Sequence, residues 1–375
     1  MNPSVRSLIT VDLDAVRANV LRFRGVLGTT KLCAVVKADA YGHGALEVGR
    51  AASEAGAAVL AVATIDEAFE LRDGGYYGPL LVMGPLSAPD EMVALASVGA
   101  EFSLVTRDMV EMLALTGHTP APLRLHLKVD TGMNRLGVHP AELTAVLGAV
   151  GRHPDAELCG IMTHFACAGE DPDCVQDQLR VFNECVAVVK PAWPDAVVHA
   201  ANSAATLHHP DTHLDMVRCG VALYGLSPFQ TSPDDDGLRP ALTWTSTVAA
   251  VKAIEPGAGA GYGHTYRAGA EGRLALIPLG YADGLRRSLG NRGHVLIAGR
   301  RQPMVGRISM DSFLVALDKD LDVKAGDPVT LLGQDGDARI PVEEMAALLD
   351  TINYEVTCGL DLRRAHRAFV GPAQE

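Results

Sequence analysis

Short apolar segments that alternate with helix-length segments dominate the first 225 residues of this chain. The candidate strands cover residues 32–36, 59–63, 80–83, 102–105, 123–129, 158–163, 197–201 and 216–218. Helical patterns lie between several of them, over residues 14–26, 45–55, 65–72 and 174–189. Parallel strands need crossover connections, usually helices, so this rhythm indicates a parallel sheet. Eight such units favour closure into a (β/α)₈ barrel, although a doubly wound open sheet also fits.

The pattern changes after Gly225. Residues 232–237, SPDDDG, are typical of an exposed linker, and a mostly β pattern follows. Its candidate strands are 242–254, 274–278, 294–298, 303–305, 313–317 and 329–332, and only 342–349 looks helical. We therefore predict a barrel domain over residues 1–235, whose first strand could pack with the second domain, and a mostly β domain over residues 236–375.

The bulk properties of the chain argue against several kinds of partner. A net charge of −13 over 375 residues does not suit a surface for nucleic acid or anionic membranes. No apolar run approaches the roughly 18 residues that span a bilayer, and the N-terminus does not read as a signal peptide. The seven cysteines are odd in number and form no CxxC, so we expect small buried thiols in a reducing cytoplasm, with no disulfide and no metal site.

Lys37 ends the first apolar segment, within AVVKADAYGHG (residues 34–44). A buried strand holds the stem of such a lysine and delivers its amine to one place. Desolvation lowers the pKa of an ammonium group, which makes part of the amine neutral and nucleophilic. These are the properties of a lysine that forms a Schiff base, although most lysines at strand ends are simply exposed.

Polar side chains also follow other candidate strands. They are Arg135 in KVDTGMNRLG (residues 128–137), His164, Asn202 with Ser203, and Arg218 with Gly220 and Val221. Chemistry in a barrel sits where the carboxyl ends of the strands meet, so these groups are expected to converge. The Ser203 hydroxyl and the amides of the last loop suit a phosphate dianion. A phosphate site beside Lys37 suggests pyridoxal 5′-phosphate (PLP) as the cofactor.

These segments and several in the β region resemble the alanine racemases, which are fold-type III PLP enzymes. The matching segments are KADAYGHG (37–44), DTGMNRLG (130–137), Asn202-Ser203, Arg218-x-Gly220, GYGxTY (261–266), GYADG (280–284) and GRISMD (306–311). The resemblance covers residues 9 to 354. It implies a head-to-tail homodimer in which each active site takes PLP from one barrel and further residues from the partner's β domain. Residues 362–369, LRRAHRAF, depart from the Arg-Val-Pro-Arg-like ending common in the family.

The resemblance implies two bases on opposite faces of the substrate. Lys37 would handle the Cα proton of D-alanine, and Tyr262, contributed by the partner subunit, that of L-alanine. His164 would hydrogen-bond Tyr262, because an unperturbed phenol titrates near ~10. Arg218 would face the pyridine nitrogen. Since arginine keeps its proton, it would leave the ring neutral and limit side reactions.

The other implied roles concern holding the cofactor and the substrate. The residues assigned to PLP are Lys37, Tyr41, His164, Asn202, Ser203, Arg218, Gly220, Val221 and Tyr354. Arg135 would reach the cofactor phenolate and the substrate carboxylate, and Met310 of the partner would bind that carboxylate through its amide. The supporting residues are Lys128, Tyr266, Tyr281 and Asp311. In parts of the family the lysine equivalent to Lys128 is carbamylated and orients the arginine.

The resemblance thus predicts a cytoplasmic alanine racemase that supplies D-alanine for peptidoglycan. A broad-specificity amino-acid racemase of the same fold is an alternative, but such enzymes typically act in the periplasm. A fold-type III decarboxylase would need an acidic group where Arg218 stands. A non-catalytic PLP carrier would lack the β domain that brings Tyr262 and Met310.

Overall fold

The computed structural model describes residues 6–371, which form two compact units. The barrel unit comprises residues 16–223. The β unit joins the residues up to 15 with those from 224 onward. Within the described part of the chain, no helix has the length and apolar character to cross a bilayer.

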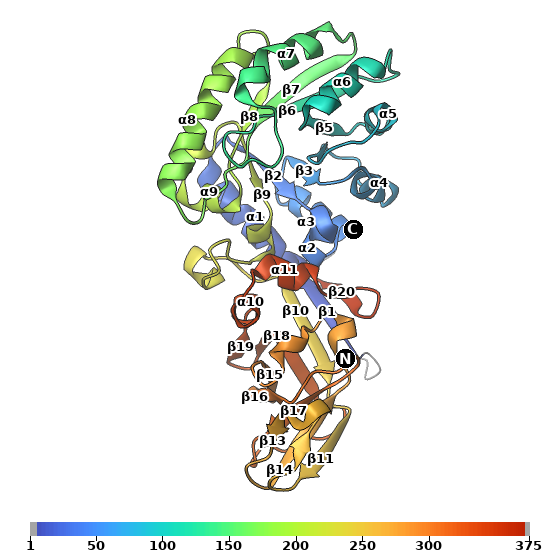
Figure 1. The fold of residues 1–375 in the computed structure, drawn as a ribbon, viewed down its shortest axis with the longest axis vertical. Coiled ribbons are helices and arrows are strands. Elements are labelled where there is room, and N and C mark those ends of the chain that lie inside the picture. The colour runs from blue at the N-terminus through green and yellow to red at the C-terminus, as the bar shows by residue number, and fades with distance from the viewer. Residues whose placement is uncertain (1–5, 372–375) are drawn as a thin grey trace. The chain divides into compact units, whose positions relative to one another are not determined.

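Eight parallel strands close the barrel unit (Figure 1). They are β2 (Lys31–Val35), β3 (Val59–Val62), β4 (Leu80–Val82), β5 (Glu101–Leu104), β6 (Leu123–Lys128), β7 (Ala156–Met162), β8 (Val197–His199) and β9 (Met216–Cys219). The pairing of β9 with β2, for example Met216 with Lys31, completes the circle. The predicted barrel is confirmed, and an open sheet is wrong. Each predicted strand lies within two residues of an observed one.

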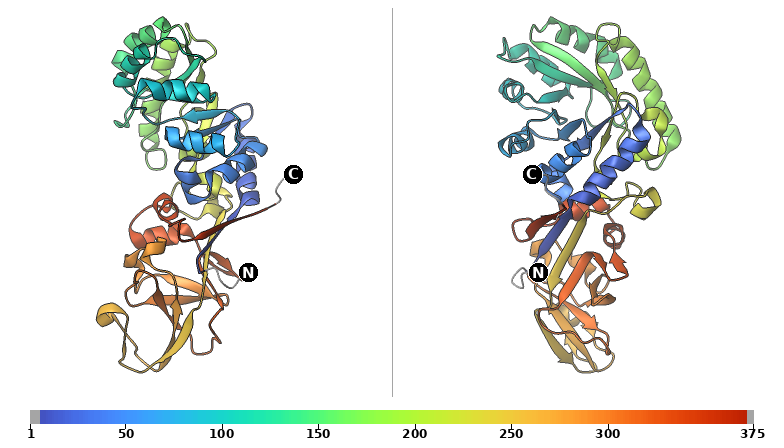
Figure 2. Two further views of the ribbon diagram at one scale, coloured as in Figure 1. Left: turned by 90° about the vertical axis from the view of Figure 1, so that its right-hand side faces the viewer. Right: turned by 180° about the vertical axis from the view of Figure 1, so that it is seen from behind.

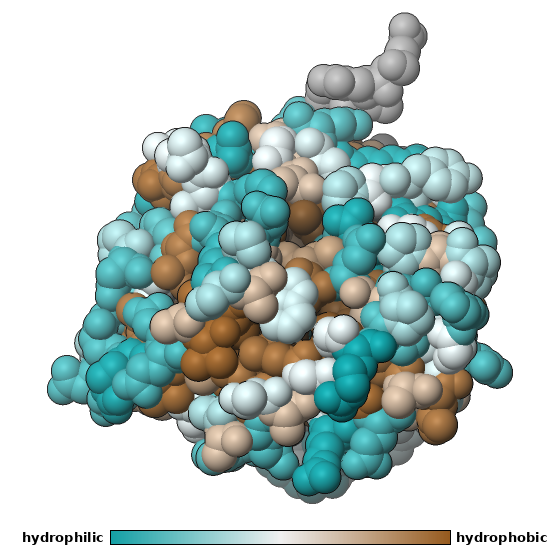
Figure 3. Space-filling view, turned by 90° about the horizontal axis from the view of Figure 1, so that it is seen from above, coloured by the Kyte–Doolittle hydropathy of each residue, from teal (hydrophilic) through white to brown (hydrophobic). Residues whose placement is uncertain are grey.

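Helices form the outside of the barrel (Figure 2). They are α1 (Leu13–Leu27), α3 (Ala45–Glu54), α4 (Ile65–Asp73), α5 (Pro89–Ser97), α6 (Arg107–Leu115), α7 (Leu143–Arg152), α8 (Pro172–Val189) and α9 (Ser203–His208). Side-chain caps begin several of them: Thr64 and Glu67 form a capping box on α4, and Asp171 accepts two amide bonds at the start of α8. In space-filling form, the face seen from above is mostly polar at its rim, with apolar side chains nearer the centre (Figure 3).

One large sheet organises the β unit. Its order is β11-β14-β17-β16-β15-β18-β10-β1-β20, with β19 beside β18. The bounds are β1 (Leu8–Asp12), β10 (Leu242–Thr247), β11 (Ala250–Ile254), β14 (Gly272–Ile277), β15 (His294–Ile297), β16 (Arg300–Val305), β17 (Phe313–Leu317), β18 (Pro328–Asp335), β19 (Ala338–Ile340) and β20 (His366–Val370). The chain's first described strand, β1, thus lies between β10 and β20 (Figure 1). The mostly β character predicted for the second domain is confirmed.

Three details of the β unit differ from the sequence prediction. Residues 242–254 form two strands, because the chain turns between β10 and β11 and each strand pairs with different neighbours. Helix α10 (Val342–Leu349) is as predicted, but α11 (Asn353–Cys358) was not foreseen, since six residues carry little helical periodicity. The atypical segment 362–369 supplies most of β20, which pairs in parallel with β1.

The cysteines are only partly core residues. All seven carry reduced thiols. Cys33, Cys185 and Cys219 are buried, but Cys358 is exposed on α11, so the expectation of uniformly buried thiols is wrong there.

Candidate active site

Lys37 lies two residues beyond the end of β2, at the start of a turn with unusual backbone geometry. Four successive residues, Ala38, Asp39, Ala40 and Tyr41, have φ between 51° and 57°. Left-handed conformations cost L-residues about 1–2 kcal/mol each. A run of them persists only where surrounding contacts fix it, and such strain gathers at functional sites.

Side chains from neighbouring elements hold this left-handed turn in place. Glu67 on α4 accepts the Ala38 amide at 2.6 Å through one oxygen and the Ala63 amide at 2.7 Å through the other. Asp39 accepts the amide of Ala45 at 2.8 Å and so ties the turn to the start of α3. These bonds fix the direction in which the chain leaves β2, and with it the position of Lys37.

Three of the predicted phosphate ligands meet beside this turn. The Ser203 hydroxyl accepts the Gly220 amide at 3.0 Å. A Cβ on Gly220 would lie 2.5 Å from the Tyr41 hydroxyl, so only glycine allows this approach. The hydroxyls of Tyr41 and Ser203 therefore flank a glycine backbone, the kind of concave polar surface that binds a phosphate dianion. Asn202 caps α9 by accepting the Ala205 amide at 3.0 Å. The buried Val221 directly follows Gly220 in the chain.

Positive charges converge at the same end of the barrel. Burial lowers the pKa of His164 well below its usual value, and Arg218, Lys128, Arg135 and Lys37 lower it further. Burial, followed by Arg218 and Arg135, lowers the pKa of Lys128 to about 8. Four cations around one neutral imidazole form a strongly electropositive cluster in a chain of negative net charge. Such a cluster suits a ligand that carries several negative charges.

Arg218 is buried, and its two terminal nitrogens bond the barrel interior. Its guanidinium donates to the carbonyls of Thr163 at 2.6 Å and Ala200 at 3.0 Å. It also donates to Nδ1 of His199 at 3.0 Å and to Nδ1 of His164 at 3.3 Å. Burial lowers the pKa of Arg218 to about 10, which still leaves it charged at neutral pH. Because an arginine has only donors, both histidines must accept at Nδ1 and carry their proton on Nε2.

A chain of hydrogen bonds continues from Arg218 across the barrel interior. His199 Nε2 donates to His126 Nδ1 at 2.8 Å, and His126 Nε2 donates to Glu101 at 2.9 Å. Glu101 stands at the start of β5, the strand end opposite the candidate site. The network therefore fixes the orientation of Arg218 through residues that lie away from the chemistry.

The loop that carries Arg135 is tied to the His164 loop by Gln178 of α8. The Gln178 amide donates to Thr131 at 3.1 Å and to the His164 carbonyl at 3.2 Å, and it accepts the Ala166 amide at 2.8 Å. Arg135 itself is exposed. Arg135 thus projects from a loop that Gln178 holds in place near its start. Lys128, at the end of β6, is instead buried.

The β unit brings together a second group of the predicted residues. Tyr262, Met310 and Tyr281 are 70%, 52% and 43% exposed. The amides of Tyr281 and Ala282 bond the carbonyls of Ser309 and Met310, each at 3.1 Å. Tyr262 lies with Arg307, Ser309 and Ser312 around a hollow of about 370 Å³, whose lining is Gly261, Tyr262, Leu276, Arg307, Ser309, Ser312, Phe313 and Leu314. Large exposed side chains gathered in this way mark an interaction surface.

The remaining predicted residues are also in the β unit. Tyr266 pairs with Ala260 in the two-stranded β12–β13 ribbon, Gly259–Ala260 with Tyr266–Arg267. Asp311 is exposed and bonds Arg364. Tyr354 lies on α11, where burial raises the pKa of its phenol to about 12 and so keeps it protonated.

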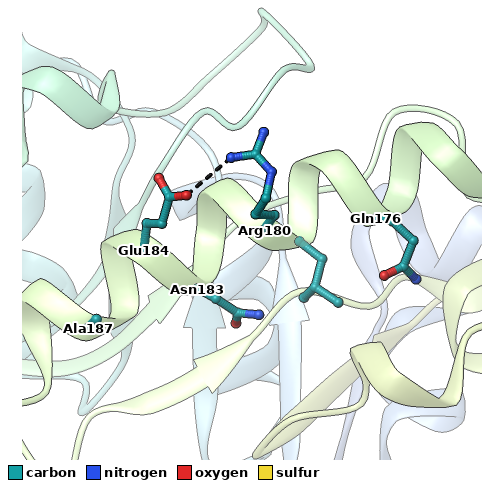
Figure 4. A pocket seen from close by; sticks show the side chains of 6 residues that line it. Gln176, Arg180, Asn183, Glu184 and Ala187 are labelled. Atoms are coloured by element: carbon teal, nitrogen blue, oxygen red, sulfur yellow. Dashed lines mark hydrogen bonds and ion pairs between the residues drawn. The ribbon is translucent and has the colours of Figure 1, made fainter.

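A hollow of about 480 Å³ along α8 is a different kind of feature. Its lining includes Gln176, Asn183, Arg180 and Glu184, and the last two form an ion pair at 3.1 Å (Figure 4). These are ordinary side chains on the outer face of a barrel helix, and none of the predicted site residues is among them.

Several residues of the site were not foreseen from sequence. The Thr64-x-x-Glu67 pattern predicts that Glu67 caps a helix. It does not predict that Glu67 also accepts the Ala38 amide. His126 and His199 stand inside apolar strands, which was a visible signal that something polar lies within the barrel. Nothing in the sequence of α8 distinguishes Gln178 from the other polar residues of that helix.

Comparisons with known proteins agree across the whole chain. The family "Alanine racemase, N-terminal domain" matches residues 11–228, and "Alanine racemase, C-terminal domain" matches residues 241–369. An alanine racemase of Symbiobacterium thermophilum is 42% identical over 364 residues, covering 96% of both chains. One of Geobacillus stearothermophilus is 42% identical, covering 94% of this chain and 91% of its own.

Solved structures give the same result. The alanine racemase of D-cycloserine-producing Streptomyces lavendulae superposes with a TM-score of 0.91, at 38% identity and with 98% of both chains covered. That of Bacillus anthracis, solved with bound L-Ala-P, superposes with a TM-score of 0.89 at 35% identity, covering 98% of this chain and 95% of its own. The chain is thus a two-unit protein, a closed parallel barrel followed by a β unit, with the fold of these enzymes. The chain belongs to the alanine racemase family, and it is an isomerase that acts on an amino acid.

Proposed function

We propose that this enzyme interconverts L-alanine and D-alanine with PLP by a two-base mechanism. One observation carries the proposal: Lys37, Lys128, Arg135 and Arg218 converge on the neutral His164 beside the Tyr41–Gly220 cradle. The cations suit a phosphate and a substrate carboxylate together. The L-Ala-P bound by the Bacillus anthracis relative, a ligand named for alanine, is in accord with the assignment.

The residues of the barrel unit fit PLP. The missing Cβ of Gly220 lets the Tyr41 hydroxyl approach its backbone, and the Ser203 hydroxyl accepts the Gly220 amide, so two hydroxyls that suit a phosphate lie close together. Lys37 would hold the aldehyde carbon through its amine, and the buried Arg218 would face the ring nitrogen. When bound, PLP makes the Cα–H bond of an amino acid acidic by delocalising the resulting charge.

Lys37 acts as one of the two bases in this proposal. With PLP and substrate bound, its amine would take the Cα proton from one face or return it. The left-handed turn fixes where the lysine leaves β2, so its amine approaches the substrate from a single side. General bases need such fixed geometry before their pKa matters.

Tyr262 of the partner subunit acts as the second base, on the opposite face. His164 accepts from Arg218 at Nδ1, so its Nε2–H is available as a donor. A hydrogen bond from that group to the phenol oxygen favours the phenolate, which Tyr262 needs to accept a proton near neutral pH. Burial and four nearby cations keep His164 itself neutral, so it acts as a donor rather than as a competing base.

Arg218 limits what else can happen to the substrate. It keeps its proton, since a pKa of about 10 lies well above neutrality. Facing the ring nitrogen, Arg218 would donate a hydrogen bond without giving up its proton, and PLP would then supply a weaker electron sink than beside an acidic partner. Direct return of the proton is favoured over transamination.

A head-to-tail homodimer is part of the proposal. Tyr262, Tyr281 and Met310 are exposed on the β unit, whereas Lys37 and the phosphate cradle belong to the barrel unit. The exposed aromatic and methionine side chains are the kind that fill a partner's pocket. Met310 would bind the substrate carboxylate together with Arg135, and Tyr266 and Tyr281 would line the mouth of the site. Tyr354 would join the phosphate ligands. The cytoplasmic location and the supply of D-alanine for peptidoglycan remain predictions from the resemblance.

The test is to incubate the purified enzyme and PLP with single L-amino acids and to follow both enantiomers by chiral chromatography. The expected result is rapid formation of D-alanine from L-alanine and slow or no conversion of larger side chains. Conversion of many amino acids at equal rates would favour a broad-specificity racemase. Loss of carbon dioxide, or no reaction, would contradict racemisation.

A further inference from the structure

In the β unit, two loops that carry predicted substrate-site residues lie directly against each other. The first, residues 280–284, carries Tyr281, and the second, residues 309–312, carries Met310. A Cβ on Gly280 would lie 2.3 Å from the Ser309 carbonyl oxygen and 2.4 Å from that of Met310. The two backbones therefore touch, with no side chain between them.

Asp283 is the buried centre that closes the first of these loops. Its carboxylate has no exposed surface. One oxygen accepts the Gly280 amide at 2.9 Å and an Arg6 nitrogen at 3.3 Å. The other oxygen bonds Arg6 and lies 3.2 Å from Nε of Arg364. A buried carboxylate with two arginine partners is a rigid anchor, because each of its oxygens is held by an arginine nitrogen.

Arg364 extends this anchor to the second loop. While its Nε faces Asp283, its terminal nitrogen pairs with Asp311, the residue after Met310. Arg364 comes from the segment that departs from the family's usual ending, and its own backbone is held by the Asp361 carbonyl at 3.1 Å. The Asp361 amide in turn bonds the Asp283 carbonyl at 3.2 Å.

We propose that Arg364 is a positioning residue that clamps the Tyr281 and Met310 loops together and so sets the placement of Met310 for substrate binding. The link to substrate rests on the proposed function, whereas the clamp itself rests only on contacts within the β unit. The neighbouring Arg363 offers a matched control. Its side chain is 90% exposed and pairs with Asp361 at 2.8 Å.

The first measurement is hydrogen–deuterium exchange, read by mass spectrometry, on the full-length enzyme without cofactor or substrate. We expect Arg364→Ala to speed exchange of peptides covering residues 305–314 about tenfold, since a local opening becomes easier when its clamp is lost. Arg363→Ala should leave these peptides as in the wild type. If these peptides exchange no faster in Arg364→Ala than in Arg363→Ala, the clamp is overturned, whatever the enzyme's activity.

The second measurement is steady-state kinetics with alanine. We expect Arg364→Ala to raise KM about tenfold and to change kcat by less than about twofold, the pattern of lost ground-state positioning. Arg364→Lys, which can keep one of the two carboxylate contacts, should fall between. If Arg364→Ala does not fold, Asp311→Asn removes the same contact to the second loop and should give the same KM shift.

The outcomes separate the clamp from the function. Faster exchange with an unchanged KM would overturn the link between the clamp and the substrate. Faster exchange in a protein that racemises nothing would leave the clamp standing and contradict the proposed function instead.

Discussion

In the barrel unit Arg218, Lys128 and Ser203 are buried and Arg218 is bonded to several neighbours, whereas in the β unit Tyr262, Tyr281 and Met310 stand exposed on loops. Arg218 is 4% exposed and makes four hydrogen bonds, but Tyr262 is 70% exposed on a short 3₁₀ turn. The barrel half is therefore organised before any ligand arrives. The β half presents large exposed side chains, which is the physical reason for proposing a shared site.

The largest expected effect comes from removing the barrel base. Lys37→Ala should abolish racemisation and the visible absorbance of covalently held PLP, because Lys37 is the amine that the proposal assigns to the cofactor aldehyde. Lys31→Ala at the opposite, exposed end of the same strand is the matched control and should retain both. An unchanged absorption spectrum in Lys37→Ala would disprove its role as the cofactor lysine.

The next effect separates the two faces of the substrate. Tyr262→Phe keeps the ring and loses the base, so we expect removal of the L-alanine proton to slow by about 10²–10⁴-fold, the usual worth of a general base. Exchange of the D-alanine proton with deuterated solvent should persist, since it depends on Lys37. Tyr77→Phe, an exposed tyrosine of the barrel unit, is the control. Equal slowing in both directions would argue against two separate bases.

A smaller effect concerns the free energy of unfolding, and it tests whether Lys128 is buried among the cations of the barrel unit. The folded protein lowers the pKa of Lys128 from 10.5 to about 8, so the unfolded chain binds more protons between these values. Stability from this group therefore rises with pH across that window. We therefore compare the effect of Lys128→Met on the unfolding free energy at pH 7 with its effect at pH 10.5. The substitution should be more stabilising at pH 7, by up to about 3 kcal/mol.

The measurement is chemical denaturation of the cofactor-free protein in buffer free of carbon dioxide, at both pH values. Lys252→Met, on an exposed strand position of the β unit, should show no such difference. The same change in stability at both pH values for Lys128→Met would mean that neither burial nor the nearby cations lower the pKa of Lys128.

The sequence predicted the architecture better than it predicted the local geometry of the site. Periodicity located all eight barrel strands, because each is an apolar segment between helical ones. It could not foresee four consecutive left-handed residues after Lys37, since Ala38 and Ala40 have no intrinsic preference for that conformation. That turn depends on Glu67, which is 29 residues from its partner Ala38.

Long-range pairing explains the other omissions. The parallel pairing of β1 with β20 joins the two ends of the described chain, and no local pattern in either segment specifies it. The chain from Arg218 to Glu101 joins four strands through His199 and His126, so its members are adjacent only after the barrel closes. The convergence of side chains at strand ends was predictable because the barrel rule places those ends together.

The central claim is that each active site combines one subunit's barrel with its partner's β unit, and mixing two inactive variants tests it most directly. Lys37→Ala and Tyr262→Phe are co-expressed with different tags so that the mixed dimer can be purified. In that dimer one site has both defects, and the other has an intact Lys37 and an intact Tyr262. A random mixture should therefore recover about a quarter of wild-type activity, and the purified mixed dimer about half. No recovery in a well-formed mixed dimer would contradict the shared site and place both bases in one chain.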